Sequence, residues 1–208
     1  MKVKICGLRD KDNIREIAGM KPDYLGFIFY KASPRYAGDI LDVDTLNELD
    51  EGLKKVGVFV NEDLNKVKDI ALAYGLDVLQ LHGNENPAYC RELKGENFEI
   101  IKAFNPVDKN DFGAMKEYHG SCDYFLLDNR GRMAGGSGQK FDWEILDKYK
   151  LDIPFFLSGG IGPEDSEQLL SMNYKNMTAI DINSRFEIAP GVKDPALVEE
   201  FLNKIRTK

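Results

Sequence analysis

The chain has 208 residues and a formal net charge of −7, and 43% of its residues are hydrophobic and 30% charged. This composition is typical of an ordinary globular protein and excludes a disordered or fibrous one. The acidic balance argues against a nucleic-acid partner, and no apolar run approaches the roughly 18 residues of a membrane span.

The cysteines Cys6, Cys90 and Cys122 are an odd number without CxxC spacing, and the chain has only two histidines. This pattern is typical of neither a disulfide framework nor a zinc site. The short apolar part of MKVKICG leads directly into charged residues, unlike a secretory signal. We therefore expect a reducing, cytoplasmic location and no bound metal.

Eight short runs rich in β-branched and aromatic residues recur along the chain and predict β-strands. They cover residues 3–6, 24–29, 55–60, 77–82, 99–104, 124–128, 153–158 and 178–182. Between them, apolar residues three and four apart predict amphipathic helices, several of which open with Asp, Asn or Pro. These helical stretches include residues 10–20, 61–75, 86–95, 141–150, 162–172 and 194–208.

Strands that alternate with helices predict repeated βαβ units and a parallel sheet. Eight such units can close into a (β/α)8 TIM barrel, although 208 residues is near the lower size limit of that fold. The alternative is an open doubly wound sheet, but neither G-x-G-x-x-G nor GxxxxGK[ST] occurs. No linker interrupts the chain, so we expect one α/β barrel domain over residues 1–208.

Four chemically capable side chains stand at the ends of predicted strands, namely Cys6, His82, Asp128 and Asp181. Each lies on the same face of its strand as the residue two positions earlier, as His82 does with Gln80. The residues on the opposite face of these strands are apolar and should pack under the helices, so the four side chains should point into the barrel. Taken alone, a cysteine is more often inert and an aspartate more often a turn former. Their coincidence at the C-terminal ends of strands, where barrel active sites lie, favours a shared site.

Three loops carry further candidates. The segment LSGGIGPED contains Gly159 and Gly160, whose backbone N–H groups can approach a ligand closely. The next loop, residues 181–194, supplies the hydroxyl of Ser184, and loops after the seventh and eighth strands of barrels commonly bind phosphate. Arg35 follows the second strand and has a planar fork suited to a carboxylate. The alternative for Gly159 and Gly160 is an ordinary turn, and the alternative for Arg35 is a solvated loop arginine.

The sequence resembles the phosphoribosylanthranilate isomerases of tryptophan biosynthesis over essentially its whole length. The resemblance rests, in chain order, on KICGL, DYLGFIFYKASPRY, VGVFVN, LQLHGNE, IIKAF, FLLD, GGSGQKFDW, LSGGIGPED and DINSRFE. It implies a monomeric or homodimeric (β/α)8 barrel that uses no cofactor. The implied activity is the Amadori rearrangement of N-(5-phospho-β-D-ribosyl)anthranilate to 1-(2-carboxyphenylamino)-1-deoxyribulose 5-phosphate.

The same resemblance implies roles for the candidate residues. Cys6 corresponds to the general base, Asp128 to the general acid and Arg35 to the ligand of the anthranilate carboxylate. The remaining implied contacts are phosphate on Gly159, Gly160 and the backbone around Asn183 and Ser184, with His82 and Asp181 lining the cleft. We expect Lys4, in phase with Cys6, to lower the pKa of the thiol, and we expect burial or a neighbouring carboxylate to keep Asp128 protonated.

Two features depart from the family pattern. Arg185 stands where a glycine is usual, so it either reaches the phosphate or redirects the loop. The helix opening GPED lacks the family's usual Asn or Thr before Pro163, a mild change that leaves the helix N-terminus intact. A related isomerase of histidine biosynthesis performs the same rearrangement on an aminoaldose with two phosphates, and it remains the alternative activity. The single phosphate-type loop pair favours the tryptophan-pathway substrate. A catalytically inactive scaffold would have lost Cys6 or Asp128, and a metal-dependent hydrolase would need clustered histidine and carboxylate ligands.

Overall fold

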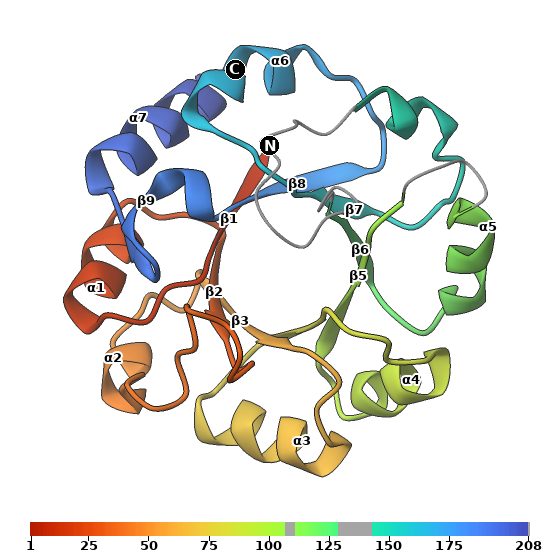
Figure 1. The fold of residues 1–208 in the computed structure, drawn as a ribbon, viewed down its shortest axis with the longest axis horizontal. Coiled ribbons are helices and arrows are strands. Elements are labelled where there is room, and N and C mark those ends of the chain that lie inside the picture. The colour runs from red at the N-terminus through yellow and green to blue at the C-terminus, as the bar shows by residue number, and fades with distance from the viewer. Residues whose placement is uncertain (107–110, 129–142, 208) are drawn as a thin grey trace.

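The computed structural model describes residues 1–106, 111–128 and 143–207. Its central feature is a closed barrel of eight parallel strands that pair in chain order, with β1 pairing to β8 to complete the ring. Figure 1 shows the ring of strands with the helices arranged around it. The strands are β1 (Lys2–Cys6), β2 (Tyr24–Ile28), β3 (Lys54–Phe59), β4 (Val78–Leu81), β5 (Glu99–Phe104), β6 (Tyr124–Leu127), β7 (Phe155–Leu157) and β8 (Met177–Ile182).

Helices and short 3-10 turns connect the strands on the outside of the barrel. The helices are α1 (Lys11–Gly19), α2 (Val43–Asn47), α3 (Leu64–Ala73), α4 (Pro87–Gly95), α5 (Asp111–Met115), α6 (Ser166–Ser171) and α7 (Pro195–Arg206). The 3-10 turns are η1 (Lys116–Tyr118), η2 (Trp143–Lys148), η3 (Pro163–Asp165) and η4 (Ser184–Phe186), and the last leads into a hairpin of β9 (Glu187–Ala189) and β10 (Val192–Lys193). In the described part of the chain, no helix combines the length and apolarity needed to cross a membrane.

The predicted (β/α)8 barrel is confirmed, and each predicted strand overlaps an observed one. The helical stretches differ more. The described part of residues 141–150 is the 3-10 turn η2 instead of an α-helix, and the predicted helix opening at Pro163 begins as the 3-10 turn η3 before α6. The sequence stretches singled out as helical did not include α2 and α5, which are five residues each.

The longer helices begin where short polar side chains satisfy the first free backbone N–H groups. Asp10 accepts from the backbone N–H of Asn13 at the start of α1. Asp63, Asn86 and Asp194 do the same for α3, α4 and α7. These caps fix where each helix starts and therefore how short the preceding loop is.

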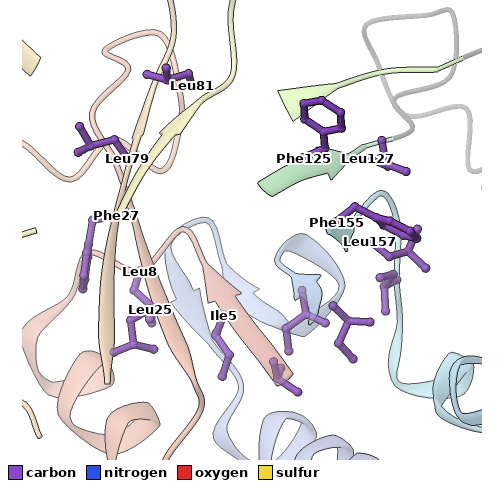
Figure 2. Packing of buried hydrophobic residues seen from close by; sticks show 14 of the residues in the cluster. Ile5, Leu8, Leu25, Phe27, Leu79, Leu81, Phe125, Leu127, Phe155 and Leu157 are labelled. Atoms are coloured by element: carbon purple, nitrogen blue, oxygen red, sulfur yellow. The ribbon is translucent and has the colours of Figure 1, made fainter. Parts of the chain in front are cut away.

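The two faces of the strands form two separate apolar cores. The outward face packs under the helices, and Figure 2 shows part of this layer, including Ile5, Leu79 and Leu127. A smaller cluster fills the barrel interior, where the rings of Tyr24 and Phe156 lie 5.1 Å apart. Its buried members are Tyr24, Val56, Val78, Ile101, Ala103, Leu126, Phe156 and Ala179.

The predicted strand phase is therefore correct. Leu126 and Ala179, two positions before Asp128 and Asp181, belong to the interior cluster, while Leu127 belongs to the outer layer. Successive side chains of a strand point to opposite faces, so the two aspartates project toward the barrel axis at its C-terminal end.

Candidate active site

A cavity of about 570 Å³ opens at the C-terminal ends of the strands. All nine residues singled out in the sequence line it. They are Cys6, Arg35, His82, Asp128, Gly159, Gly160, Asp181, Asn183 and Ser184. Their convergence follows from the parallel topology, because the carboxyl ends of all eight strands meet at the same mouth. Their individual chemical roles remain predictions.

Cys6 is the last residue of β1 and is only 4% exposed. Its register partner on β2 is Gly26, and a Cβ built at that glycine would lie 2.8 Å from the Cys6 sulfur. The absent side chain of Gly26 thus makes the space that the thiol occupies. The next residue, Gly7, has a φ of +81°, and a Cβ there would meet Asn183 and Arg35.

Lys4 lies one pleat below Cys6 and is fully buried. Its Nζ is 2.9 Å from Oδ1 of Asp181, the residue opposite it on β8. Burial would lower the pKa of Lys4, but the attraction of Asp181 and Cys6 outweighs it and the net shift is upward. Lys4 therefore supplies a permanent positive charge at the base of the site.

The pKa of Cys6 is raised in this environment. Burial is the largest cause, and the neighbouring Lys4 ammonium opposes it without cancelling it. The influence of Lys4 has the expected sign, but the expectation of a net lowered thiol pKa is wrong for this structure, because desolvation disfavours the thiolate more than one cation favours it. Burial likewise raises the pKa of Asp181; Lys4 opposes that shift and Asp128 adds to it.

Asp128 directly follows β6 and is 8% exposed. His82, which follows β4, brings its Nε2 to 3.3 Å from Oδ2 of Asp128. On the other side of the imidazole ring, Nδ1 lies 2.9 Å from Nε2 of Gln80. The imidazole of His82 therefore lies between Gln80, to which it is hydrogen-bonded, and the carboxyl group of Asp128.

Arg35 forms a bidentate ion pair with Glu187, which the sequence did not indicate. Its Nε and Nη2 lie 2.8 Å and 2.6 Å from the two carboxylate oxygens of Glu187 on β9. Lys193 on β10 also donates to Glu187, at 2.6 Å, and to Oδ1 of Asn183, at 2.8 Å. Burial would raise the pKa of Glu187, but hydrogen bonds from Arg35 and Lys193 outweigh it and hold the pKa below its ordinary value.

The loops after β7 and β8 face the same cavity. Gly159 and Gly160 have φ angles of +97° and +72°, conformations that only glycine adopts readily. A Cβ at Gly160 would meet nothing within 4 Å, so its backbone borders open space. Arg185 does not line the cavity; its Nη2 is 2.6 Å from Oε1 of Glu164 in the neighbouring loop. Arg185 therefore joins the two loops through a half-exposed ion pair.

Glu187 and Lys193 were missed as site residues because their role depends on contacts that sequence spacing does not reveal. The signal that could have found them is a glutamate and a lysine at the two ends of the short segment EIAPGVK, with Pro and Gly between them. The structure shows that this lysine, Lys193, is fully buried. In the sequence, Gln80 served only to show which face of the strand carries His82. The glycine-rich segment over residues 134–143 lies outside the described residues except for Trp143.

A second cavity of about 460 Å³ adjoins the first at His82 and Asp128. Its floor includes Lys102, whose Nζ donates to the backbone oxygens of Leu81 and Gly83 and lies 3.3 Å from Glu85. Lys102 and Glu85 are both buried. This ion pair fixes the loop that follows β4 and thus the backbone that carries His82.

Comparison with known proteins gives a consistent result. The family model for N-(5'phosphoribosyl)anthranilate (PRA) isomerase matches residues 3–204. A protein of Parabacteroides distasonis named N-(5'-phosphoribosyl)anthranilate isomerase is 43% identical over 206 residues, covering 99% of this chain and 93% of the relative. The crystal structure of phosphoribosyl anthranilate isomerase from Thermotoga maritima superposes with a TM-score of 0.84 at 30% identity, covering 100% of both chains.

A further crystal structure is that of a phosphoribosyl anthranilate isomerase in complex with reduced 1-(o-carboxyphenylamino)-1-deoxyribulose 5-phosphate. It superposes on this chain with a TM-score of 0.81 at 28% identity, again over 100% of both chains. That protein therefore holds a ligand with one carboxylate, one phosphate and a pentose-derived chain.

Proposed function

Because this chain belongs to the N-(5'-phosphoribosyl)anthranilate isomerase family of tryptophan biosynthesis, we propose that Cys6 and Asp128 are the general base and general acid of its Amadori rearrangement. The substrate is N-(5-phospho-β-D-ribosyl)anthranilate and the product is 1-(2-carboxyphenylamino)-1-deoxyribulose 5-phosphate. The observation that carries this proposal is that Cys6, Asp128 and the carboxylate-binding candidate Arg35 line one cavity.

The reaction needs one acid and one base. Asp128 gives its proton to the ring oxygen as the C1–O bond breaks, which leaves a protonated imine between C1 and the anthranilate nitrogen. The Cys6 thiolate then removes the proton from C2, and the electron pair of that C–H bond forms the C1–C2 double bond of an enolamine. Tautomerisation moves a proton from the C2 hydroxyl to C1 and gives the ketone.

The raised pKa of Cys6 suits this sequence of events. The reactive form is the fraction of Cys6 whose proton has already left to solvent; the thiolate of a weakly acidic thiol is a stronger base, and the positive charge of the opened imine stabilises it. Lys4 is one pleat away and adds a fixed positive charge that favours the thiolate. The base is therefore activated most when the ring-opened intermediate is present.

His82 supports the acid. Its Nε2 lies 3.3 Å from Oδ2 of Asp128, so a small approach allows Nε2–H to donate to the carboxylate that remains after the proton has left. Such a bond to an ionised acceptor is stronger than one to a neutral acceptor, so it favours the transition state over the ground state.

Arg35 is suited to hold the anthranilate carboxylate. Glu187 engages Nε and Nη2 of the guanidinium, and a guanidinium has five N–H donors, so Nη1 and the second Nη2 hydrogen can serve a second carboxylate. Apolar side chains in the same cavity lining, Ile28, Val58 and Val60, offer a surface for the aromatic ring.

We assign the substrate phosphate to the loops after β7 and β8. Backbone N–H groups of Gly159 and Gly160, with Asn183 and the hydroxyl of Ser184, line the cavity where the loops after β7 and β8 meet. Two successive residues with positive φ leave their amides accessible to an anion, as in other phosphate-binding turns. Asp181 lines the cavity as the partner of Lys4, so its role is to keep that lysine in place.

The test follows the fluorescence of the anthranilate moiety. Anthranilate, phosphoribosyl pyrophosphate and the preceding transferase generate the labile substrate in the cuvette, and this protein should then quench the signal. Cys6→Ser and Asp128→Asn should each lower kcat by about 10²–10⁴-fold with unchanged circular dichroism.

Cys90→Ser is the matched control, because Cys90 is equally buried but lies on α4 outside the cavity. It should keep its turnover. A Cys6→Ser or Asp128→Asn variant that retains half of the wild-type kcat contradicts the assigned roles.

A further inference from the structure

Gln80 is a buried polar residue to which the mechanism above gives no role. It is 1% exposed, stands on β4 one pleat below His82 and lines the main cavity. Its Oε1 is one of two buried side-chain polar atoms of the described residues that have no hydrogen-bond partner, the other being Nε1 of Trp143. Buried polar atoms are nearly always paired, so this unpaired oxygen requires an explanation.

The orientation of the Gln80 amide is set by hydrogen bonding, because a half-turn would exchange its nitrogen and oxygen with little change of shape. The nitrogen faces Nδ1 of His82 at 2.9 Å. An amide nitrogen can only donate, so Nδ1 must be the accepting nitrogen, and the proton of the neutral ring is on Nε2.

The far side of the ring is compatible with the same arrangement. Nε2 of His82 lies 3.3 Å from Oδ2 of Asp128, where a ring N–H can donate to the carboxyl group. With the amide reversed, Oε1 would call for a proton on Nδ1, and a bare Nε2 would then face the oxygen of Asp128. The amide orientation that keeps the His82 proton on Nε2, facing Asp128, therefore leaves Oε1 of Gln80 without a partner.

We propose that Gln80 is a positioning residue that holds His82 in its Nε2–H form, so that His82 stabilises the Asp128 carboxylate left when the proton moves to the sugar ring oxygen. No proton leaves His82 in this step; the C1–O bond breaks, the ring oxygen gains the Asp128 proton, and the new carboxylate accepts a hydrogen bond from Nε2–H. The inference rests on the proposed role of Asp128 as the acid.

The first test separates turnover from binding. Gln80→Leu removes both amide atoms and should lower kcat about tenfold, while the KM and the Kd of the reduced product analogue stay within about twofold. Gln80→Glu preserves the shape but replaces the donor with an acceptor, and it should lose at least as much kcat. Gln168→Leu, an exposed glutamine on α6, is the matched control and should be unchanged.

The second test measures directly which ring nitrogen of His82 carries the proton. Nitrogen-15 NMR of the imidazole should show His82 of the wild type in the Nε2–H form, and Gln80→Leu should give a mixture of the two forms. The loss should also depend on His82: in a His82→Leu background, Gln80→Leu should cost less than twofold more, because Gln80 acts on Asp128 only through His82.

An Nδ1–H form in the wild type, a Gln80→Leu kcat within twofold of wild type, a Kd that weakens as much as kcat falls, or fully multiplicative losses in the double variant would each overturn the proposal. The general acid assignment is tested separately by Asp128→Asn. Its failure would appear as retained turnover in that variant, whatever Gln80 does.

Discussion

At the scale of single residues, the chemistry of the site depends on how deeply its thiol is buried. Burial raises the pKa of Cys6, and Lys4 partly opposes the rise. In the free protein, alkylation of Cys6 by iodoacetamide should therefore follow an apparent pKa above the ordinary thiol value of about 8.5. Lys4→Met removes the opposing cation and should move that apparent pKa further upward.

The measurement is the rate of alkylation at a series of pH values, read for each cysteine peptide by mass spectrometry. The other two thiols provide internal references, because burial raises the pKa of Cys90 to about 11 and that of Cys122 to about 12. A Lys4→Met variant whose Cys6 reacts at lower pH than the wild type would refute the assigned influence of Lys4.

Gly26 is the second residue whose effect can be predicted from contacts alone. The Cβ of Gly26→Ala would lie 2.8 Å from the Cys6 sulfur and 3.0 Å from its Cα, so the thiol or the strand must move. We expect kcat to fall at least tenfold and the free energy of unfolding to drop by about 1–3 kcal/mol. Gly19→Ala is the control: nothing lies within 4 Å of its Cβ at the end of α1.

Gly19→Ala should leave kcat unchanged and raise stability by about 0.4–1 kcal/mol, because it only reduces the freedom of the unfolded chain. Urea unfolding and the fluorescence assay measure both variants. Equal activity in the two variants would show that Gly26 does not make room for the thiol.

At the scale of elements, the strands were predictable and the short helices were not. The strands are marked by runs such as LQLH and YFLLD, whose alternation also identified the inward face that carries His82 and Asp128. The helices α2 and α5 have five residues each, too few for the helical period to repeat. Tertiary packing, not an amphipathic pattern, defines these connections.

The nine cavity residues could be found from strand ends and loops because the barrel topology determines where strand ends meet. The partner of Arg35 could not, since Glu187 is 152 positions away in the sequence and joins it only when the β9–β10 hairpin folds over the loop after β2. A sequence shows that a guanidinium can bind a carboxylate, but not which carboxylate takes one of its edges.

That hairpin gives a prediction of its own. Glu187→Gln places an amide donor against the donors of Arg35, so the guanidinium should lose its fixed orientation. If Arg35 binds ground state and transition state equally, KM should rise about tenfold with kcat within about threefold. Glu199→Gln, an exposed site on α7, is the control and should match the wild type. An unchanged KM would contradict a positioning role for Glu187.

The same variant should alter the dependence of stability on pH. The pKa of Glu187 is below its ordinary value of about 4.3, so its ion pairs contribute stability that is fully present above that pH. This contribution is lost as pH falls through the lower folded-state pKa. Urea unfolding should therefore show a shallower acid loss for Glu187→Gln than for the wild type below about pH 4.3.

At the scale of the whole molecule, closure of the barrel brings two charges together in its interior. Lys4 and Asp181 lie opposite each other on β1 and β8, at 0% and 6% side-chain exposure. Lys4→Met or Asp181→Leu alone leaves one buried charge unpaired and should cost about 3–5 kcal/mol. The double variant replaces the pair with apolar groups and should recover most of that loss.

Thermal unfolding can measure this, because 1 kcal/mol corresponds to about 2–4 °C in Tm for a chain of this size. Each single variant should melt at least about 6 °C below the wild type, and the double variant should melt above both. Losses that simply add in the double variant would show that the two charges do not stabilise each other across the closing strands.

The pairing of β1 with β8 also has a consequence for biosynthesis. Cys6 is synthesised long before β8, because Lys4 and its partner Asp181 are 177 positions apart in the sequence. We therefore expect a fragment that lacks β8 to leave Cys6 accessible to solvent and to show no isomerase activity, because β8 pairs with β1 and supplies Asp181 to the cavity. Asn183 and Ser184 line the cavity and lie beyond β8, so the cavity lining is complete only after these residues have also been made.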